Sequence, residues 1–313
     1  MKHYGADITC GEMAVVTCLL EGKASEWALL KRHPCEDVFG VQLAGGYPDQ
    51  FSRIGQLLHE RDDLSADFVD MNLGCPLDLI CNKGAGAGLM MRERRLKDCV
   101  ISLTNQLGHV PVTIKIRTGW DMEKPFAHKL IPTIQSWGIP PNAIGAIMLH
   151  GRSRLQRYAK AANWEYIAQA GKSQSEELHK IPLIGNGDIM SFTDYEEKVE
   201  QHRKENENDG GSVLQPTAMI GRGALIKPWL PTEIKERRHW DISASERMDM
   251  LREFVKFGLE HWGSDQKGVN LTRRFLLEWL SFLHRYVPVG LLERVPQRFN
   301  QRPPTYIQGR SDL

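Results

Sequence analysis

The chain has 313 residues, of which 41% are apolar and 25% charged, enough for one large domain of roughly 200 to 250 residues and a smaller one. The formal net charge of +1 indicates no particular partner, so a basic surface for a nucleic acid must come from local clustering. The sequence holds no apolar run of about 18 residues, and its start lacks the order of a signal peptide. We therefore expect no membrane partner and a location in the cytoplasm, the nucleus or both.

Short apolar or β-branched segments recur along the chain and predict strands. Their starts are about 30 to 44 residues apart, and most gaps hold helix-like sequence, as at Phe51–Glu60, Leu89–Gln106 and Phe126–Trp137. Strands that alternate with helices form parallel sheets, either a (β/α)8 barrel or an open doubly wound sheet. The predicted strands are Ile8–Cys10, Val38–Leu43, Phe68–Leu73, Val112–Arg117, Ile144–His150, Leu183–Asn186 and Ala218–Ile220.

Two observations favour the TIM barrel. No G-x-G-x-x-G follows the first strand, and the residues with chemical potential follow several strands instead of one switch point. A barrel of this type needs eight strands and seven are found, while residues 1–4 resemble the end of a helix. We therefore expect that the first strand is missing. The polar segment 197–216 predicts a helix end and a solvated loop.

A helical C-terminal domain follows the barrel. After Lys227 the strand period stops, and two long helical patterns follow, at Ser243–Trp262 and Thr272–Tyr286. We expect a catalytic barrel over residues 1–231 and a helical domain over residues 232–313.

The last part of this domain is rich in arginine. With Trp279 and Tyr286 between them, the arginines favour phosphate contacts and base stacking on RNA, although a solvated helix face is the alternative. The arginines are Arg273, Arg274, Arg285, Arg294, Arg298, Arg302 and Arg310, against Glu278, Glu293 and Asp312.

The six cysteines lie in the first third of the chain, without a C-x-x-C pair or regular spacing, so we expect free thiols and no metal site. Cys75 differs from the others because it follows the end of a buried strand and precedes Pro76 and the glycine-rich segment 83–88. At the mouth of a barrel a cysteine can serve as a nucleophile or an acid, as its pKa allows. Cys81 and Cys99 are interpreted as buried apolar residues.

Polar residues also end the next two predicted strands. Lys115 and Arg117 are two apart, so both point to one face of an otherwise apolar strand, where a buried lysine needs an anionic partner. His150 and Arg152 follow at the end of the next strand. A lone histidine is usually structural, but these four side chains at one end of a barrel favour a shared ligand.

Two glycine-containing loops follow the last two predicted strands. They are Ile184–Ile189 and Met219–Ala224, where barrels often bind phosphate through backbone N–H groups. Each loop alone could be a tight turn. Together they indicate a phosphate-bearing cofactor.

These segments, MNLGCPLD, KGAGAGLM, VTIKIRTG, LHGRSR, GNGDI and MIGRGALIKPW, in this order, resemble the tRNA-dihydrouridine synthases. Further segments, among them GADITCGEMA and SEWALLKRHP, resemble the eukaryotic tRNA-dihydrouridine(47) synthases. The resemblance covers essentially the whole chain. It implies a (β/α)8 barrel that binds FMN and uses NADPH or NADH to reduce the C5–C6 double bond of a uridine in tRNA.

The resemblance also implies roles for single residues. Cys75 would be the catalytic acid that protonates C5 of the uracil. Asn72 would orient the uracil, with Arg117 and Arg152 near the substrate. Lys235, Arg237 and Arg238 would join the arginine-rich part in binding tRNA. FMN would be bound by Gln42, Lys115, His150, Asn186, Gly187, Asp188, Gly221 and Arg222.

Two other functions remain open at this point. One is an FMN oxidoreductase that acts on free pyrimidines, against which the arginine-rich helical domain argues. The other is an RNA-binding remnant without FMN, because the family's first strand and its N-terminal zinc-finger region are not found in this sequence. No obligate protein partner is indicated.

Overall fold

The computed structural model describes residues 1–61, 65–200, 214–283 and 286. Within them all six cysteines are free thiols. The helices of this part of the chain are all too short or too polar to cross a membrane. Five of the predicted arginine contacts lie outside the described residues: Arg285, Arg294, Arg298, Arg302 and Arg310.

In the described part of the chain seven parallel strands form one sheet, and each strand pairs with those that precede and follow it in sequence. This sequential order is that of a (β/α)8 barrel, whereas a doubly wound sheet reverses its order at a switch point. The strands are β1 Ile8–Val15, β2 Val38–Ala44, β3 Phe68–Asn72, β4 Val112–Arg117, β5 Ile144–His150, β6 Leu183–Asn186 and β7 Leu214–Met219.

The predicted bounds of the edge strands were wrong. Strand β1 continues to Val15 through a bulge, a register shift between Cys10 and Met13. The sequence did not indicate this continuation because the polar Glu12 interrupts the apolar residues. Strand β7 begins at Leu214, so the predicted loop 197–216 ends too late. Pro216 lies within this strand, as an edge strand tolerates.

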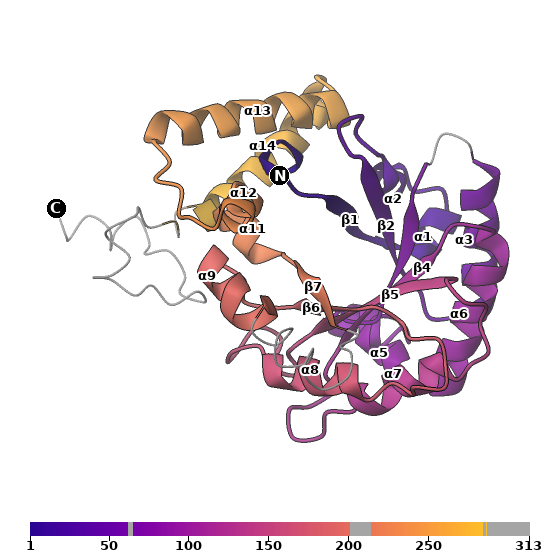
Figure 1. Cartoon of the computed structure of the whole chain (residues 1–313). Coiled ribbons are helices and arrows are strands. Elements are labelled where there is room, and N and C mark those ends of the chain that lie inside the picture. The colour runs from indigo at the N-terminus through magenta and orange to yellow at the C-terminus, as the bar shows by residue number, and fades with distance from the viewer. Residues whose placement is uncertain (62–64, 201–213, 284–285, 287–313) are drawn as a thin grey trace.

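Helices cover the outer face of the sheet (Figure 1). The elements α3, α6, α7 and α8 follow β2, β3, β4 and β5, so the pattern is the predicted β-then-α repeat. The helices are α1 Val16–Leu20, α2 Ala24–Trp27, α3 Pro48–Glu60, α4 Asp78–Cys81, α5 Ala87–Met90, α6 Glu93–Leu107, α7 Ala127–Gln135, α8 Trp164–Lys172, α9 Phe192–Tyr195, α11 Arg222–Ile226, α12 Leu230–Glu236, α13 Ala244–Trp262 and α14 Gln266–Leu283; shorter turns are η1 Lys2–Tyr4, η2 Ala28–Leu30 and the π segment η3 Glu196–Glu200.

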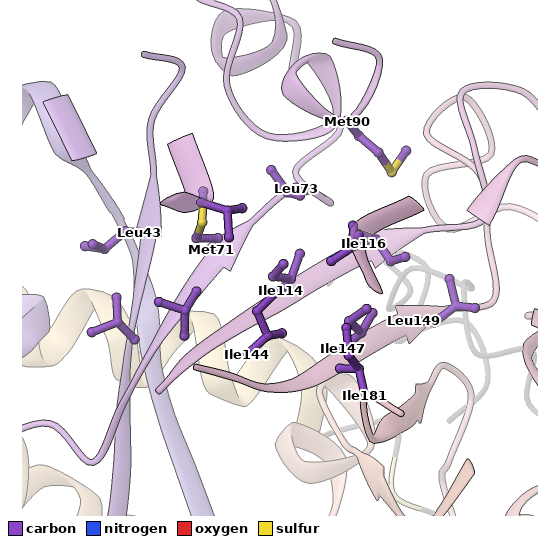
Figure 2. Packing of buried hydrophobic residues seen from close by; sticks show 14 of the residues in the cluster. Leu43, Met71, Leu73, Met90, Ile114, Ile116, Ile144, Ile147, Leu149 and Ile181 are labelled. Carbon is purple, nitrogen blue, oxygen red and sulfur yellow. The ribbon is translucent and has the colours of Figure 1, made fainter. Parts of the chain in front are cut away.

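Alternation along the strands separates an apolar row from a polar one. On β4, Ile114 and Ile116 are fully buried in the main hydrophobic cluster (Figure 2). Because side chains alternate along a strand, Thr113, Lys115 and Arg117 point to the opposite face, the interior of the barrel. The same alternation on the neighbouring strands places the other candidate residues in that interior.

The C-terminal helices pack against the barrel and against one another. The predicted stacking role of Trp279 and Tyr286 on RNA bases is wrong, because their exposed fractions are only 9% and 7%. The indole of Trp279 donates to the carbonyl of Leu225 at 2.9 Å, and the ring of Tyr286 packs edge-on against Trp229 at 5.1 Å. Both rings are therefore parts of a second hydrophobic core.

The two long helices differ in how well their starts were predicted. Ser243 caps α13 together with Glu246 in a capping box. Helix α14 begins at Gln266, six residues before the predicted start at Thr272, because the side chain of Asp265 accepts the N–H of Gly268 at 2.8 Å. Helix α12 begins at Leu230, and Thr232 donates to the carbonyl of Tyr4 at 2.8 Å, so the predicted domain boundary at residue 232 falls inside a helix that contacts the N-terminal turn. The boundary therefore stays a prediction.

Candidate functional site

Strand register brings the predicted residues of β2 to β6 together in the barrel interior. Gln42 on β2 pairs with Asp70 on β3, and Asp70 pairs with Thr113 on β4. One row nearer the carboxyl ends, Asn72 pairs with Lys115. The next row joins Arg117, His150 and Asn186.

The row farthest from the mouth contains a buried carboxylate. Asp70 has no exposed surface, and its two oxygens accept hydrogen bonds of 2.7 Å each, from Gln42 Nε2 and from Thr113 Oγ1. Burial raises the pKa of Asp70 to about 6, which the two hydrogen bonds oppose. The group is therefore mostly ionised at neutral pH, and both of its oxygens act as acceptors here.

Asn72 carries this network to the loop of Cys75. Its Nδ2 donates to Gln42 Oε1 at 2.7 Å, and its Oδ1 accepts the backbone N–H groups of Gly74 and Cys75 at 3.1 and 2.8 Å. The amide of Asn72 thus holds the turn that ends β3. It leaves the thiol of Cys75 half-buried at the mouth of the barrel.

The Cys75 loop is also held from the side by the glycine-rich segment. The backbone N–H of Ala87 donates to the carbonyl of Cys75 at 3.1 Å. A Cβ on Gly86 would lie 2.9 Å from that same carbonyl oxygen, so this position requires glycine. Burial raises the pKa of the Cys75 thiol, although Arg117 and a backbone hydrogen bond oppose the shift. Cys75 is therefore a protonated thiol at neutral pH.

Arg117 joins two loops at the mouth. Its Nε donates to Gly74 O at 2.7 Å, and its Nη1 donates to the carbonyls of Ser153 and Arg157 at 3.0 Å each. Only 3% of Arg117 is exposed. The structure therefore shows this guanidinium bonded to the protein backbone beside Cys75.

Arg152 is held in a similar way. It donates to Lys160 O at 2.6 Å and 3.0 Å and forms an ion pair of 2.7 Å with Asp188. Asp188 adopts a left-handed φ of 55° and also accepts the N–H of Ala162 at 2.8 Å. Asp188 thus fixes the loop after β6 to the loop after β5.

Lys115 and Asn186 face each other across the barrel. Lys115 Nζ donates to Asn186 Oδ1 at 2.9 Å, and Asn186 Nδ2 donates to the carbonyl of Met219 at 2.7 Å. Burial, aided by Arg117, lowers the pKa of Lys115 to about 8, which Asp70 opposes. Lys115 is therefore mostly charged at neutral pH but loses its proton easily.

The interior beyond Lys115 is strongly positive. Burial lowers the pKa of His150, and the cations Lys115, Arg117, Arg152 and Arg222 lower it further, so the imidazole is neutral. Burial and Arg152 also lower the pKa of Arg222 to about 10. Mutual repulsion among buried cations disappears when an anion binds between them, so the cluster favours an anionic ligand.

The loops after β6 and β7 leave room beside these cations. A Cβ on Gly221 would meet no atom within 4 Å, whereas a Cβ on Gly187, at a φ of 129°, would lie 2.6 Å from Ala162. The guanidinium of Arg222 lies 4.2 Å from the ring centre of Tyr158 and 3.7 Å from Asp188. Gly187 is therefore required by packing, whereas the space beside the backbone of Gly221 is open.

The donor set fits the phosphate and the ring of a flavin mononucleotide. Arg222 and the open backbone at Gly221 suit a phosphate. Lys115 and the neutral His150 suit polar ring atoms, where a cation can stabilise negative charge. The structure thus brings together the eight residues predicted to bind a cofactor, except that Gln42 lies deeper, between Asp70 and Asn72.

Three residues of this site carried no role in the sequence analysis. Asp70 and Thr113 form the buried end of the network, and Tyr158 covers Arg222. A carboxylate within the apolar segment 68–73 was a usable signal, because an isolated buried charge is costly. Tyr158 lies in a polar loop and gave no signal.

Comparisons with known proteins agree with this geometry. The sequence profile described as "Dihydrouridine synthase (Dus)" matches residues 1–278. Curated relatives named "tRNA-dihydrouridine(47) synthase [NAD(P)(+)]-like" come from Rattus norvegicus, 53% identical over 306 residues, and from Homo sapiens, 54% identical over 306 residues. A relative of the same name from Oryza sativa subsp. japonica is 50% identical over 312 residues.

The alignments cover 98%, 98% and 100% of this chain but only 44%, 43% and 42% of those relatives, so the chain spans less than half of their length. Solved structures are more distant. A variant of NCR from Zymomonas mobilis has a TM-score of 0.49 at 13% identity, covering 77% of this chain and 80% of that one.

Proposed function

Because this chain belongs to the dihydrouridine synthase family, we propose that it is the catalytic part of an FMN-dependent tRNA-dihydrouridine(47) synthase. The reaction reduces the C5–C6 double bond of a uridine in tRNA, with NADPH or NADH as the source of electrons. One observation carries the proposal. A protonated cysteine is fixed at the mouth of a barrel whose interior holds a cluster of cations suited to a flavin phosphate.

FMN supplies the hydride for C6 of the uracil when it is bound and reduced. Cys75 donates the proton to C5, and its raised pKa keeps the thiol protonated for this step. Lys115 and His150 would contact the flavin ring, and Gln42 would do so from its deeper position between Asp70 and Asn72. Asn186, Gly187, Asp188, Gly221 and Arg222 would bind its phosphate-bearing chain.

For the substrate, we propose that Asn72 orients the uracil. Arg117 and Arg152 have their guanidinium groups bonded to backbone carbonyls and to Asp188, which supports a role in positioning loops instead of direct contact with the uridine. This revises the expected roles of the two arginines. It does not change the assignment of Cys75.

The target uridine must leave the folded tRNA to reach the barrel interior, at a cost of about a few kcal/mol. Phosphate contacts of the C-terminal helices offset this cost. Lys235, Arg237 and Arg238 are exposed but form ion pairs with Asp7, Glu196, Glu200 and Glu236. Such surface pairs are weak, so phosphates can replace the carboxylates.

Replacing Cys75 with alanine tests the proposal. We expect turnover on unmodified tRNA to fall about 10²- to 10⁴-fold, because the proton donor is lost, while the affinity for FMN stays unchanged. Cys35→Ala is the matched control, since Cys35 is also a half-buried free thiol but precedes β2 at the opposite end of the barrel. FMN binding is followed by flavin fluorescence, and dihydrouridine by mass spectrometry of digested tRNA.

Unchanged turnover in Cys75→Ala would remove the acid role of the thiol. A native chain that binds no FMN would contradict the assignment of the cationic cluster. A chain that reduces free uracil as fast as tRNA would point to a pyrimidine oxidoreductase instead.

A further inference from the structure

The hydrogen bonds between the barrel interior and the Cys75 loop have a fixed direction. At the loop end, the N–H groups of Gly74 and Cys75 can only donate, so Asn72 must present its oxygen to them. Its Nδ2 then donates to Gln42 Oε1, which leaves Gln42 Nε2 to donate to Asp70. Each amide orientation therefore follows from the one before it.

The other end of this series is equally fixed. Asp70 accepts from Thr113 and from Gln42, each at 2.7 Å, and an ionised carboxylate has no proton to donate. Asp70 lies in no contact with the loop itself. It nevertheless decides which end of the Gln42 amide faces Asn72, and so which end of the Asn72 amide faces the loop.

We propose that Asp70 is a positioning residue whose carboxylate ends a one-way hydrogen-bond relay through Gln42 and Asn72 and thereby holds the Cys75 loop in place. The inference rests on the proposed function only where Cys75 is taken as the proton donor. The relay also fixes what Asn72 can offer a uracil, because its oxygen and one amide proton are engaged within the protein.

A reversal of the relay provides the sharpest test. In Asn72→Asp, one oxygen of the new carboxylate still accepts from the loop, but the other faces Gln42 Oε1. If the Gln42 amide turns over, its oxygen faces Asp70 instead. In either orientation two acceptor oxygens therefore face each other without a proton between them. In the double variant Asp70→Asn with Asn72→Asp, the turned Gln42 donates to the new carboxylate at position 72 and accepts from the new amide at position 70, which still accepts from Thr113. Every hydrogen bond is then restored, and the two that Gln42 makes run in the opposite direction.

The readout is hydrogen exchange of the Gly74 and Cys75 amides, measured without FMN or tRNA. We expect their protection to fall about fivefold or more in Asn72→Asp, the effect of one lost hydrogen bond, and to return to within about twofold of native in the double variant. Asp70→Asn alone has a small effect, because the oxygen of the new amide still accepts from Gln42 while its nitrogen donates to the hydroxyl of Thr113, so position 70 still ends the relay as an acceptor. Thr113→Val is the matched control, since it removes a bond to Asp70 without touching the relay.

A double variant no better protected than Asn72→Asp, or a native-like Asn72→Asp, would overturn the inference. Should Asn72→Asp fail to fold, a folded double variant supports the relay equally well, and a double variant that also fails to fold contradicts it. Hydrogen exchange of the loop amides does not depend on enzymatic activity. A chain that binds no flavin therefore refutes the proposed function while leaving the relay open to this test.

Discussion

Arg117→Lys keeps the positive charge of a buried guanidinium but removes its fork of N–H donors. Arg117 bonds to Gly74 O at 2.7 Å and to the carbonyls of Ser153 and Arg157 at 3.0 Å. The single nitrogen of a lysine can reach the Gly74 side or the side of residues 153–157, but not both. One or two charge-assisted bonds are lost, each worth about 1.5–3 kcal/mol, so we expect the free energy of unfolding to fall by about 1.5–6 kcal/mol.

Urea denaturation of native and variant chains measures this change. Arg157→Lys is the control in the same loop, because the side chain of Arg157 is exposed and makes only a 3.4 Å contact with Asp78. We expect it to change stability by no more than about 0.5 kcal/mol. If Arg117→Lys unfolds at the same urea concentration as the native chain, the guanidinium does not join the two loops and the original prediction of a substrate contact regains its support.

Two further predictions concern Lys115 and Trp279. Burial lowers the pKa of Lys115 from 10.5 to about 8, so the charged form is disfavoured in the folded state. Relative to Lys115→Met, the free energy of unfolding of the native chain should therefore rise between pH 8 and 10.5, by about 3 kcal/mol at most. Urea titrations across this pH range measure the difference, and a difference that does not change with pH would contradict the lowered pKa. Trp279→Phe removes the hydrogen bond to Leu225 and part of a buried ring. We therefore expect the melting temperature to fall, while tRNA binding in a gel-retardation assay changes little. A variant with native stability that no longer binds tRNA would restore the base-stacking interpretation.

The fold was predictable where apolar residues are continuous or alternate regularly. Residues 144–150 and 183–186 are short, largely apolar segments, and residues 112–117 carry an apolar residue at every other position, so all three form the strands that the sequence predicted. The edge strands were harder. Polar residues and Pro216 interrupt β1 and β7, and edge strands are not buried enough to show a clear period.

The candidate site shows a similar limit. Motifs at strand ends identified Cys75, Lys115 and His150, since the ends of parallel strands meet at one rim. Sequence reasoning missed the bond between Asp70 and Thr113 because it depends on strand register, which joins residues 43 apart. Trp279 was assigned to the wrong face although Leu276, three residues before it, and Leu283, four residues after it, lie at helical spacing, a pattern that indicates a buried face.

The sequential order of the strands sets an order of assembly. The relay from Asp70 to the Cys75 loop and the bond of Thr113 to Asp70 lie entirely within residues 42–113, and these cross-strand bonds join residues 28 to 43 apart. The bond of Lys115 to Asn186 spans 71 residues, and the contact of Arg222 with Asp188 needs the strand after that. During synthesis from the N-terminus, the support of the acid loop can therefore form while the cationic half of the pocket is still unmade.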